Sequence, residues 1–141
     1  MKEKLIKNRY GNFMPHNRRG KNDIYWENCK QQVDKRDKRT CQFIRCLLAK
    51  EAYSLKTGSP AILDRAHIFA ASSHPNLIYN VNNVITLSRY IHRRMDDYQD
   101  PLTGDPIDVN THYYWWLRIK THKFVEYDAD TDYEQELTRI I

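Results

Sequence analysis

The chain has 141 residues, about the length of one domain, and 40% of them are hydrophobic and 12% aromatic, which argues against a disordered chain. No stretch approaches the roughly 18 consecutive apolar residues that cross a bilayer, and residues 1–7 lack the apolar core of a secretory signal, so we expect no membrane partner and a cytoplasmic location. The net charge is +5, yet residues 1–50 hold 14 Lys/Arg against 5 Asp/Glu, whereas residues 51–141 hold 9 against 13.

The basic first third of the chain suits a polyanion such as nucleic acid, because basic side chains that neutralise phosphates release counterions. A solvated basic face without a ligand and an acidic partner protein remain the alternatives. From its charge we therefore expect the N-terminal third to suit a nucleic acid, contacted chiefly through its phosphates.

Residues 1–22 predict a basic arm of irregular structure, since they combine seven Lys/Arg with glycine and proline breakers. From Asn22 or Asp23, either of which can cap a helix, a helical pattern of apolar residues continues for about thirty residues. A charged run at 34–39 interrupts it and leaves open whether it forms one helix or two. Neither an internal repeat nor a linker occurs in 23–141, so we expect a single domain after the arm.

The rest of the chain predicts two strands and three further helices. We expect strands at 61–69 and 83–87, and helices at 88–98, 111–124 and 132–141. Ser88 can cap the first of these helices, and the capping-box pair Thr131 and Glu134 starts the last. Trp115 and Trp116 in the second helix could stack on bases, but a helix this apolar more often packs them in the core.

Four polar side chains stand out in the strand–loop–strand–helix segment. His67 lies on the first strand, Asn83 opens the second, and His92 lies one turn into the helix, four residues before Asp96. Positions i and i+4 share a helix face, so this imidazole and carboxylate can converge on one cation. A mixed nitrogen and oxygen site takes Mg²⁺, Mn²⁺, Ni²⁺ or Zn²⁺. An exposed His92–Asp96 ion pair and a structural His67 remain the alternatives.

The segment contains, in order, Asp64-Arg65-Ala66-His67-Ile68, Asn83-Val84-Ile85-Thr86-Leu87 and His92-Arg93-Arg94-Met95-Asp96. These motifs, with nine residues from Asn83 to His92, resemble the HNH (ββα-metal, His-Me finger) endonucleases in the branch with the pattern AHI…N…HxxxD, a family common in phages. The resemblance covers 64–96, about a quarter of the chain. It implies an α+β fold in which a two-stranded antiparallel hairpin plus helix (the ββα-metal motif, about 61–99) is embedded in a mainly helical single domain.

The resemblance also implies a role for each motif residue. His67 is expected to be the general base that takes a proton from the attacking water. His92 and Asp96 are expected to hold one divalent ion, with Mg²⁺ as the first candidate and Mn²⁺ or Ni²⁺ as alternatives. Asn83 is expected to complete the catalytic set by fixing the loop or the His67 ring rather than by touching metal.

Two departures from the family pattern affect the metal. Many members have a metal ligand immediately before the catalytic histidine, where this chain has Ala66; either Asp64 supplies that carboxylate or it makes a structural hydrogen bond or ion pair. Many members also carry a four-cysteine zinc site, which Ser88 and Ile91 cannot complete. A structural zinc is therefore not expected, and the odd number of cysteines (Cys29, Cys41 and Cys46) predicts reduced thiols.

The activity implied by the resemblance is metal-dependent hydrolysis of DNA phosphodiester bonds, by nicking or double-strand cleavage. The side chains expected to contact DNA are Arg65, Arg89, Arg93, Arg94, Arg18 and Arg19. A homodimer and phage packaging or replication proteins stay open as partners, in a bacterial or phage-infected cell. Two other functions also stay open: a DNA-binding module without catalysis, and a protein-binding phage or host regulator that uses the Tyr/Trp-rich helix and the acidic residues 124–141.

Overall fold

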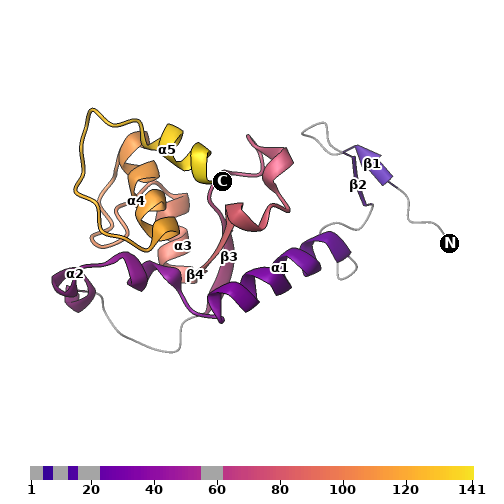
Figure 1. The fold of residues 1–141 in the computed structure, drawn as a ribbon, viewed down its shortest axis with the longest axis horizontal. Helices are drawn as coiled ribbons and strands as arrows, with labels where there is room; N and C mark the ends of the chain where they lie inside the picture. Colours follow the sequence, from indigo (N-terminus) through magenta and orange to yellow (C-terminus); the bar gives the residue numbers. More distant parts are fainter. Residues whose placement is uncertain (1–4, 8–12, 16–22, 55–61) are drawn as a thin grey trace.

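The structure, a computed structural model, describes residues 5–7, 13–15, 23–54 and 62–141, with side chains for 23–51 and 62–141. Within these residues the fold is mixed α+β, with five α-helices and two antiparallel strand pairs (Figure 1). No helix in the described part of the chain is long and apolar enough to cross a bilayer.

The N-terminal segment contains a strand pair, β1 (Leu5–Lys7) with β2 (Phe13–Pro15), where we expected only irregular structure. Each strand includes two neighbouring apolar residues. The predicted DNA contacts Arg18 and Arg19 lie outside the described residues.

The first helical region divides into two α-helices. Helix α1 (Ile24–Asp37) begins where Asp23 accepts a hydrogen bond from the Trp26 backbone nitrogen (3.1 Å). It ends where Lys38 and Arg39 take positive φ angles of 54° and 52°, which an α-helix cannot continue through. The 3₁₀ turn η1 (Gln42–Cys46) and the short helix α2 (Ala49–Ser54) follow.

The two central strands pair as β3 (Leu63–His67) and β4 (Val84–Ser88), antiparallel, with His67 opposite Val84. We expected Asn83 to open the second strand. It instead ends the 3₁₀ turn η3 (Val81–Asn83) just before that strand. A loop that includes the turn η2 (Pro75–Leu77) joins the strands. Strand β4 is buried except at its last residue, so its β-branched sequence reflects a core position.

The helices after β4 begin at the caps that side chains provide. Ser88 caps α3 (Arg89–Asp96) by accepting from the Ile91 nitrogen, as predicted, and Asp108 caps α4 (Val109–Thr121). Helix α5 (Tyr133–Ile140) is capped by Asp132 instead of Thr131. The Thr131 hydroxyl instead donates to Asp128 (3.1 Å).

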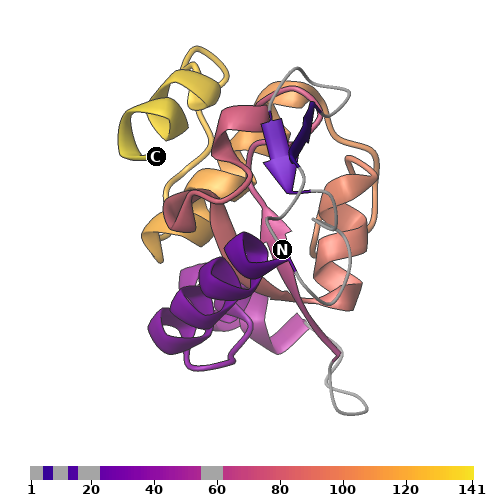
Figure 2. The ribbon, with the colours of Figure 1, turned by 90° about the vertical axis from the view of Figure 1, so that its right-hand side faces the viewer.

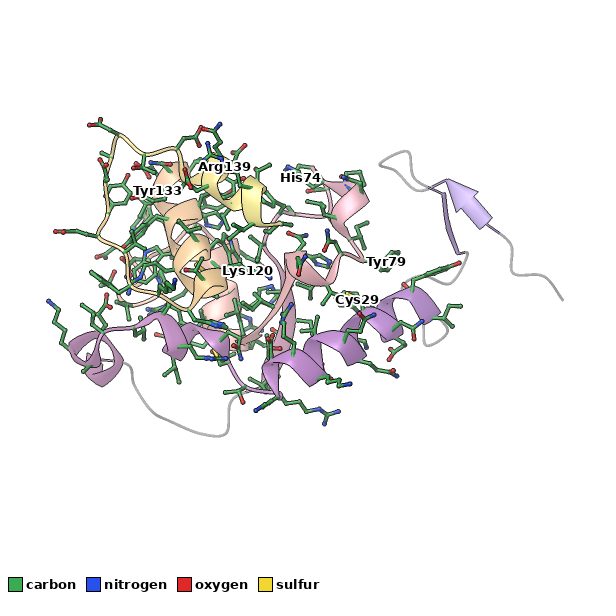
Figure 3. The ribbon with its side chains drawn as sticks, viewed as in Figure 1. Cys29, His74, Tyr79, Lys120, Tyr133 and Arg139 are labelled. Carbon is green, nitrogen blue, oxygen red and sulfur yellow. The ribbon has the colours of Figure 1, made fainter. Side chains whose placement is uncertain are left out.

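The strand pair lies between α1 on one side and α3 on the other, and α5 packs on α4 (Figures 1 and 2). Trp115 and Trp116 are 5% and 1% exposed and belong to the main core, so they are not available to stack on bases. The loop after β3 rests on the start of α1, where the Tyr79 hydroxyl donates to Asp23 at 3.2 Å (Figure 3).

An ion pair with a buried carboxylate joins α1 to β4. Asp37 is 4% exposed and accepts from the Thr86 backbone nitrogen (2.9 Å), while Arg36 donates to Asp37 and to the Val84 carbonyl (2.6 Å). Burial alone raises the pKa of Asp37, but the hydrogen bonds from Arg36 and Thr86 outweigh it and hold that pKa below its ordinary value. This contact fixes β4 against α1 and thereby positions both strands.

His112 on α4 is expected to make stability depend on pH. Its Nε2 accepts from the Trp116 indole (3.1 Å), and burial lowers its pKa to about 4. In the unfolded chain the imidazole binds a proton below about pH 6.5, whereas in the folded protein it stays neutral down to about 4, so stability falls as the pH drops through this window. At pH 5 the expected loss is about 2 kcal/mol.

The measurement is denaturant unfolding of the wild type and of His112→Gln at neutral pH and at pH 5. The glutamine can still accept from the indole but does not titrate. We expect the wild type to lose more stability on acidification than the variant does. Equal losses would show that His112 does not carry this dependence.

Candidate functional site

His67, the last residue of β3, has its ring fixed on two sides. Its Nε2 lies 2.9 Å from the Ile78 carbonyl oxygen, and the Trp26 ring stacks on it with centroids 5.3 Å apart. A carbonyl oxygen can only accept, so Nε2 carries the proton and Nδ1 keeps its lone pair. Burial lowers the pKa of His67 below 6.5, so the imidazole is neutral at neutral pH. A neutral imidazole with one free nitrogen can take a proton.

Asn83 fixes the loop between the strands. Its side chain is fully buried; Oδ1 accepts from the Phe69 nitrogen (2.8 Å), and Nδ2 donates to the carbonyls of Phe69 (3.0 Å) and Leu77 (3.2 Å). These contacts hold together the two ends of the loop that carries Ile78. Of the two roles expected for Asn83, its contacts match fixing the loop and not a direct contact with the His67 ring.

His92 on α3 lies between two carboxylates. Its Nδ1 is 3.0 Å from Asp64 Oδ2, and its Nε2 is 3.3 Å from Asp96 Oδ2. Asp64 also pairs with Arg89 at 3.0 Å. Burial alone raises the pKa of Asp64, but the hydrogen bonds from Arg89 and His92 outweigh it and hold that pKa below its ordinary value. Asp64 therefore stays ionised and accepts the Nδ1 proton of His92.

This arrangement assigns different positions to the two candidate carboxylate ligands. Because Asp64 holds Nδ1 of His92, Nε2 is the ring nitrogen that faces Asp96, whose side chain is 63% exposed. Asp64 lies at the opposite ring nitrogen, which is where a carboxylate orients a metal-binding histidine without touching the metal. The pair that can share a cation is therefore His92 and Asp96.

His67, His92 and Asp96 line one cavity of about 350 Å³, although they come from β3 and α3. No group of three or more His, Cys, Asp or Glu side chains within 23–51 and 62–141 is arranged to hold a metal ion. The chain therefore offers two donors, one nitrogen and one oxygen. That set fits a cation such as Mg²⁺, which commonly takes one or two protein ligands and completes its shell with water and phosphate oxygens.

The predicted DNA-binding arginines differ in how far they are committed to other contacts. Arg65 lines the cavity and binds Asp34 through two hydrogen bonds of 2.6 and 2.9 Å. Arg89 pairs with Asp64, and Arg94 donates to the Pro101 carbonyl (3.2 Å). Arg93 is exposed on α3. The exposed Arg93 and the half-exposed Arg89 are the most accessible of the four to a phosphate.

Sequence reasoning missed the aromatic part of the cavity lining, which consists of Tyr98, His112, Tyr113 and Trp116. Tyr98 ends α3 in a left-handed conformation (φ 53°), with its nitrogen bonded to Met95 O (3.2 Å) and the Gln99 nitrogen to Arg94 O (2.8 Å). Glycine is usual at this position of a Schellman motif, and another residue costs roughly 1–2 kcal/mol. The signal that sequence reasoning could have used is the absence of a glycine after α3, which leaves Tyr98 in the left-handed position.

Comparison of the chain with protein-family models, with curated proteins and with solved structures finds no match. The function has to be argued from the site itself. Its features are the neutral imidazole of His67, the imidazole of His92 with the carboxylate of Asp96 on α3, and a shared cavity that is also lined by aromatic rings.

Proposed function

We propose that this protein is a metal-dependent endonuclease of the HNH type, built on a ββα-metal motif formed by β3, β4 and α3, and that it hydrolyses DNA phosphodiester bonds. One observation carries the proposal: His67 and the His92–Asp96 pair line the same cavity, where Ile78 holds Nε2 of His67 and Asp64 holds Nδ1 of His92. A proton acceptor and a two-donor cation site beside each other are what this hydrolysis requires.

In the proposed reaction Nδ1 of His67 takes a proton from the attacking water. The water oxygen forms a bond to phosphorus, and the bond from phosphorus to the 3′ oxygen breaks, which leaves a 5′-phosphate. The hydrogen bond to Ile78 fixes the tautomer, and the Trp26 ring fixes the plane of the imidazole. Both contacts keep His67 ready to accept the proton without reorganisation.

Nε2 of His92 and a carboxylate oxygen of Asp96 are the groups that would hold the divalent cation, with Mg²⁺ first and Mn²⁺ or Ni²⁺ as alternatives. When bound, the cation supplies positive charge against the phosphate oxygens and the leaving oxygen. Asp64 orients His92 through Nδ1, and Arg89 keeps that carboxylate in place. Arg93 is suited to hold a phosphate that flanks the cut.

The test is conversion of supercoiled plasmid to nicked or linear DNA with Mg²⁺, Mn²⁺ or Ni²⁺ at micromolar to millimolar concentration. We expect cleavage with at least one of these ions and none with excess chelator. Salt-dependent DNA binding without cleavage under any ion would instead support a DNA-binding module. Absence of salt-dependent binding would support the protein-binding alternative.

Asp64→Asn is expected to weaken the response to metal without removing a ligand. An amide at this position is a poorer acceptor for the Nδ1 proton of His92, and loss of such an outer contact costs about 10–100-fold in metal affinity or activity. The measurement is the metal concentration that gives half-maximal nicking. Asp96→Asn is expected to have at least as large an effect.

The control is Asp97→Asn, a neighbouring exposed carboxylate at the end of α3. We expect it to leave the half-maximal metal concentration within about threefold of wild type, because surface charges act weakly. If Asp97→Asn raises that concentration and Asp96→Asn does not, the metal pair has been assigned to the wrong carboxylate.

A further inference from the structure

We propose that the cavity beside His67 is a pocket for one unpaired nucleobase, so that the preferred substrate is DNA with an unpaired nucleotide next to the phosphate that is cut. This inference rests on the proposed function for the cutting step, but the pocket itself is argued from residues that the hydrolysis does not use.

The residues that line the cavity are of two chemical kinds. His67, His92 and Asp96 are titratable, and Tyr98, His112, Tyr113 and Trp116 provide aromatic surface. A nucleotide has the same division, with a phosphate at one end and a flat aromatic base at the other. The volume of about 350 Å³ lies within the range of roughly 300–1,000 Å³ that small-molecule pockets occupy.

The aromatic residues of the cavity offer surface for stacking. Tyr98 is 41% exposed, and its ring lies against the His112 ring with centroids 3.9 Å apart and planes 12° apart. Stacking of bases on tyrosine rings is tolerant of sequence, since every base has a π face, and it strengthens binding by about tenfold or more for each base. Tyr98 can thus extend a stack that already exists inside the protein.

His112 adds a hydrogen-bond donor that nothing in the described residues satisfies. The imidazole is 6% exposed, its Nε2 accepts from the Trp116 indole, and its Nδ1 therefore carries the proton. That Nδ1 is buried without a hydrogen-bond partner in the described part of the chain. Buried donors are nearly always paired, and nucleobases carry carbonyl and ring-nitrogen acceptors.

The backbone at Tyr98 supports a role for its side chain. Glycine would fit this left-handed position without strain, yet the chain has a tyrosine there whose ring lines the cavity. Strained residues of this kind cluster at ligand sites. A tyrosine at this position comes with backbone strain. We infer that the ring is kept there for its contacts in the cavity.

The location of the pocket decides the substrate class. A base paired inside a duplex cannot enter a cavity in a protein unless it leaves the stack, and this costs least for a base that is mismatched, bulged or single-stranded. If a phosphate lies near His92 and its base lies against the aromatic residues of the cavity, the nucleotide is therefore one that is already unpaired.

The experiment uses the full chain and two duplexes of the same sequence, one with 2-aminopurine in a single-nucleotide bulge and one with it paired. Binding is measured in chelator from anisotropy and from 2-aminopurine fluorescence, and cleavage is then mapped with metal. We expect about tenfold tighter binding of the bulged duplex, quenching of 2-aminopurine in that duplex only, and cutting next to the bulge.

Tyr98→Gly is expected to bring the ratio of the two affinities close to one and to remove the quenching. Glycine suits the left-handed backbone, so the end of α3 is retained, and a denaturant midpoint verifies that the variant is folded. Tyr98→Phe, which keeps the ring, is expected to retain the preference. Tyr127→Ala removes a tyrosine of similar exposure outside the cavity and serves as the matched control.

The outcomes separate the pocket from the nuclease. Equal binding of the two duplexes, or a preference that Tyr98→Gly leaves unchanged, overturns the pocket, while metal-dependent nicking in the same samples leaves the proposed function in place. A bulge preference that depends on Tyr98, without cutting in any metal, supports the pocket and removes the nuclease.

Discussion

His67→Ala is expected to lower the rate of DNA cleavage by about 10²–10⁴-fold while DNA affinity changes little. A positioned general base contributes a factor of this size. The methyl group of alanine removes the proton acceptor but leaves the contacts of His92 and Asp96 intact. The measurement is single-turnover nicking at saturating metal, with binding followed separately in chelator.

The matched control is His74→Ala. His74 lies on the loop that follows β3, packs on Phe69 and does not line the cavity. It is expected to cut within about threefold of wild type. A His67→Ala protein that cuts as fast as the His74→Ala protein would mean that another group accepts the proton.

The pH dependence follows from the direction of the His67 shift. A general base acts when it is neutral, and burial lowers the pKa of this imidazole below 6.5. At saturating metal, the pH at which the cleavage rate falls to half of its plateau should therefore lie below 6.5. A half-maximal rate above pH 6.5 would contradict a His67 whose pKa is lowered by burial.

The parts of the fold that local sequence governs were predictable. Ser88 caps α3 as expected because the cap depends on residues within one turn. The strands β3 and β4 were expected within two residues of their ends, since apolar and β-branched runs bounded by polar loops define them. At the start of α5 the pairs Thr131 with Glu134 and Asp132 with Gln135 have the same spacing, so spacing alone could not decide which residue caps the helix.

The parts of the candidate site that depend on long-range contacts were not predictable. The Trp26 ring reaches His67 from a helix forty residues earlier, and Ile78, which sets the tautomer, contributes only a backbone carbonyl. The sequence left Asp64 open between metal ligand and structural partner, because its position at Nδ1 of His92 depends on how α3 packs on β3. Residue types identify what can react; packing decides which nitrogen faces which carboxylate.

Asn83→Ala is expected to lower the free energy of unfolding by about 3 kcal/mol or more. The truncation leaves the Phe69 nitrogen and the Phe69 carbonyl without the partner they have now, while the Leu77 carbonyl keeps its hydrogen bond from the Asn80 nitrogen. Each unsatisfied buried group costs about 1–3 kcal/mol, not fully additively. Denaturant unfolding measures this, and Asn82→Ala, next in sequence and exposed, is expected to change stability by less than about 0.5 kcal/mol. Similar effects at both positions would contradict the role of the buried amide.

Asn83→Asp separates the shape of this side chain from its hydrogen bonds. One carboxylate oxygen can still accept from Phe69, but the other replaces Nδ2 and lies against the carbonyls of Phe69 and Leu77, which cannot donate to it. The folded state therefore favours the protonated acid and raises its pKa above the unfolded value, so the destabilisation is largest at neutral pH and shrinks as the pH falls through the raised pKa. Asn83→Ala has no such group. A stability difference between the two variants that narrows or reverses on acidification would show that the donor of Asn83, more than its volume, holds the loop that sets the His67 tautomer.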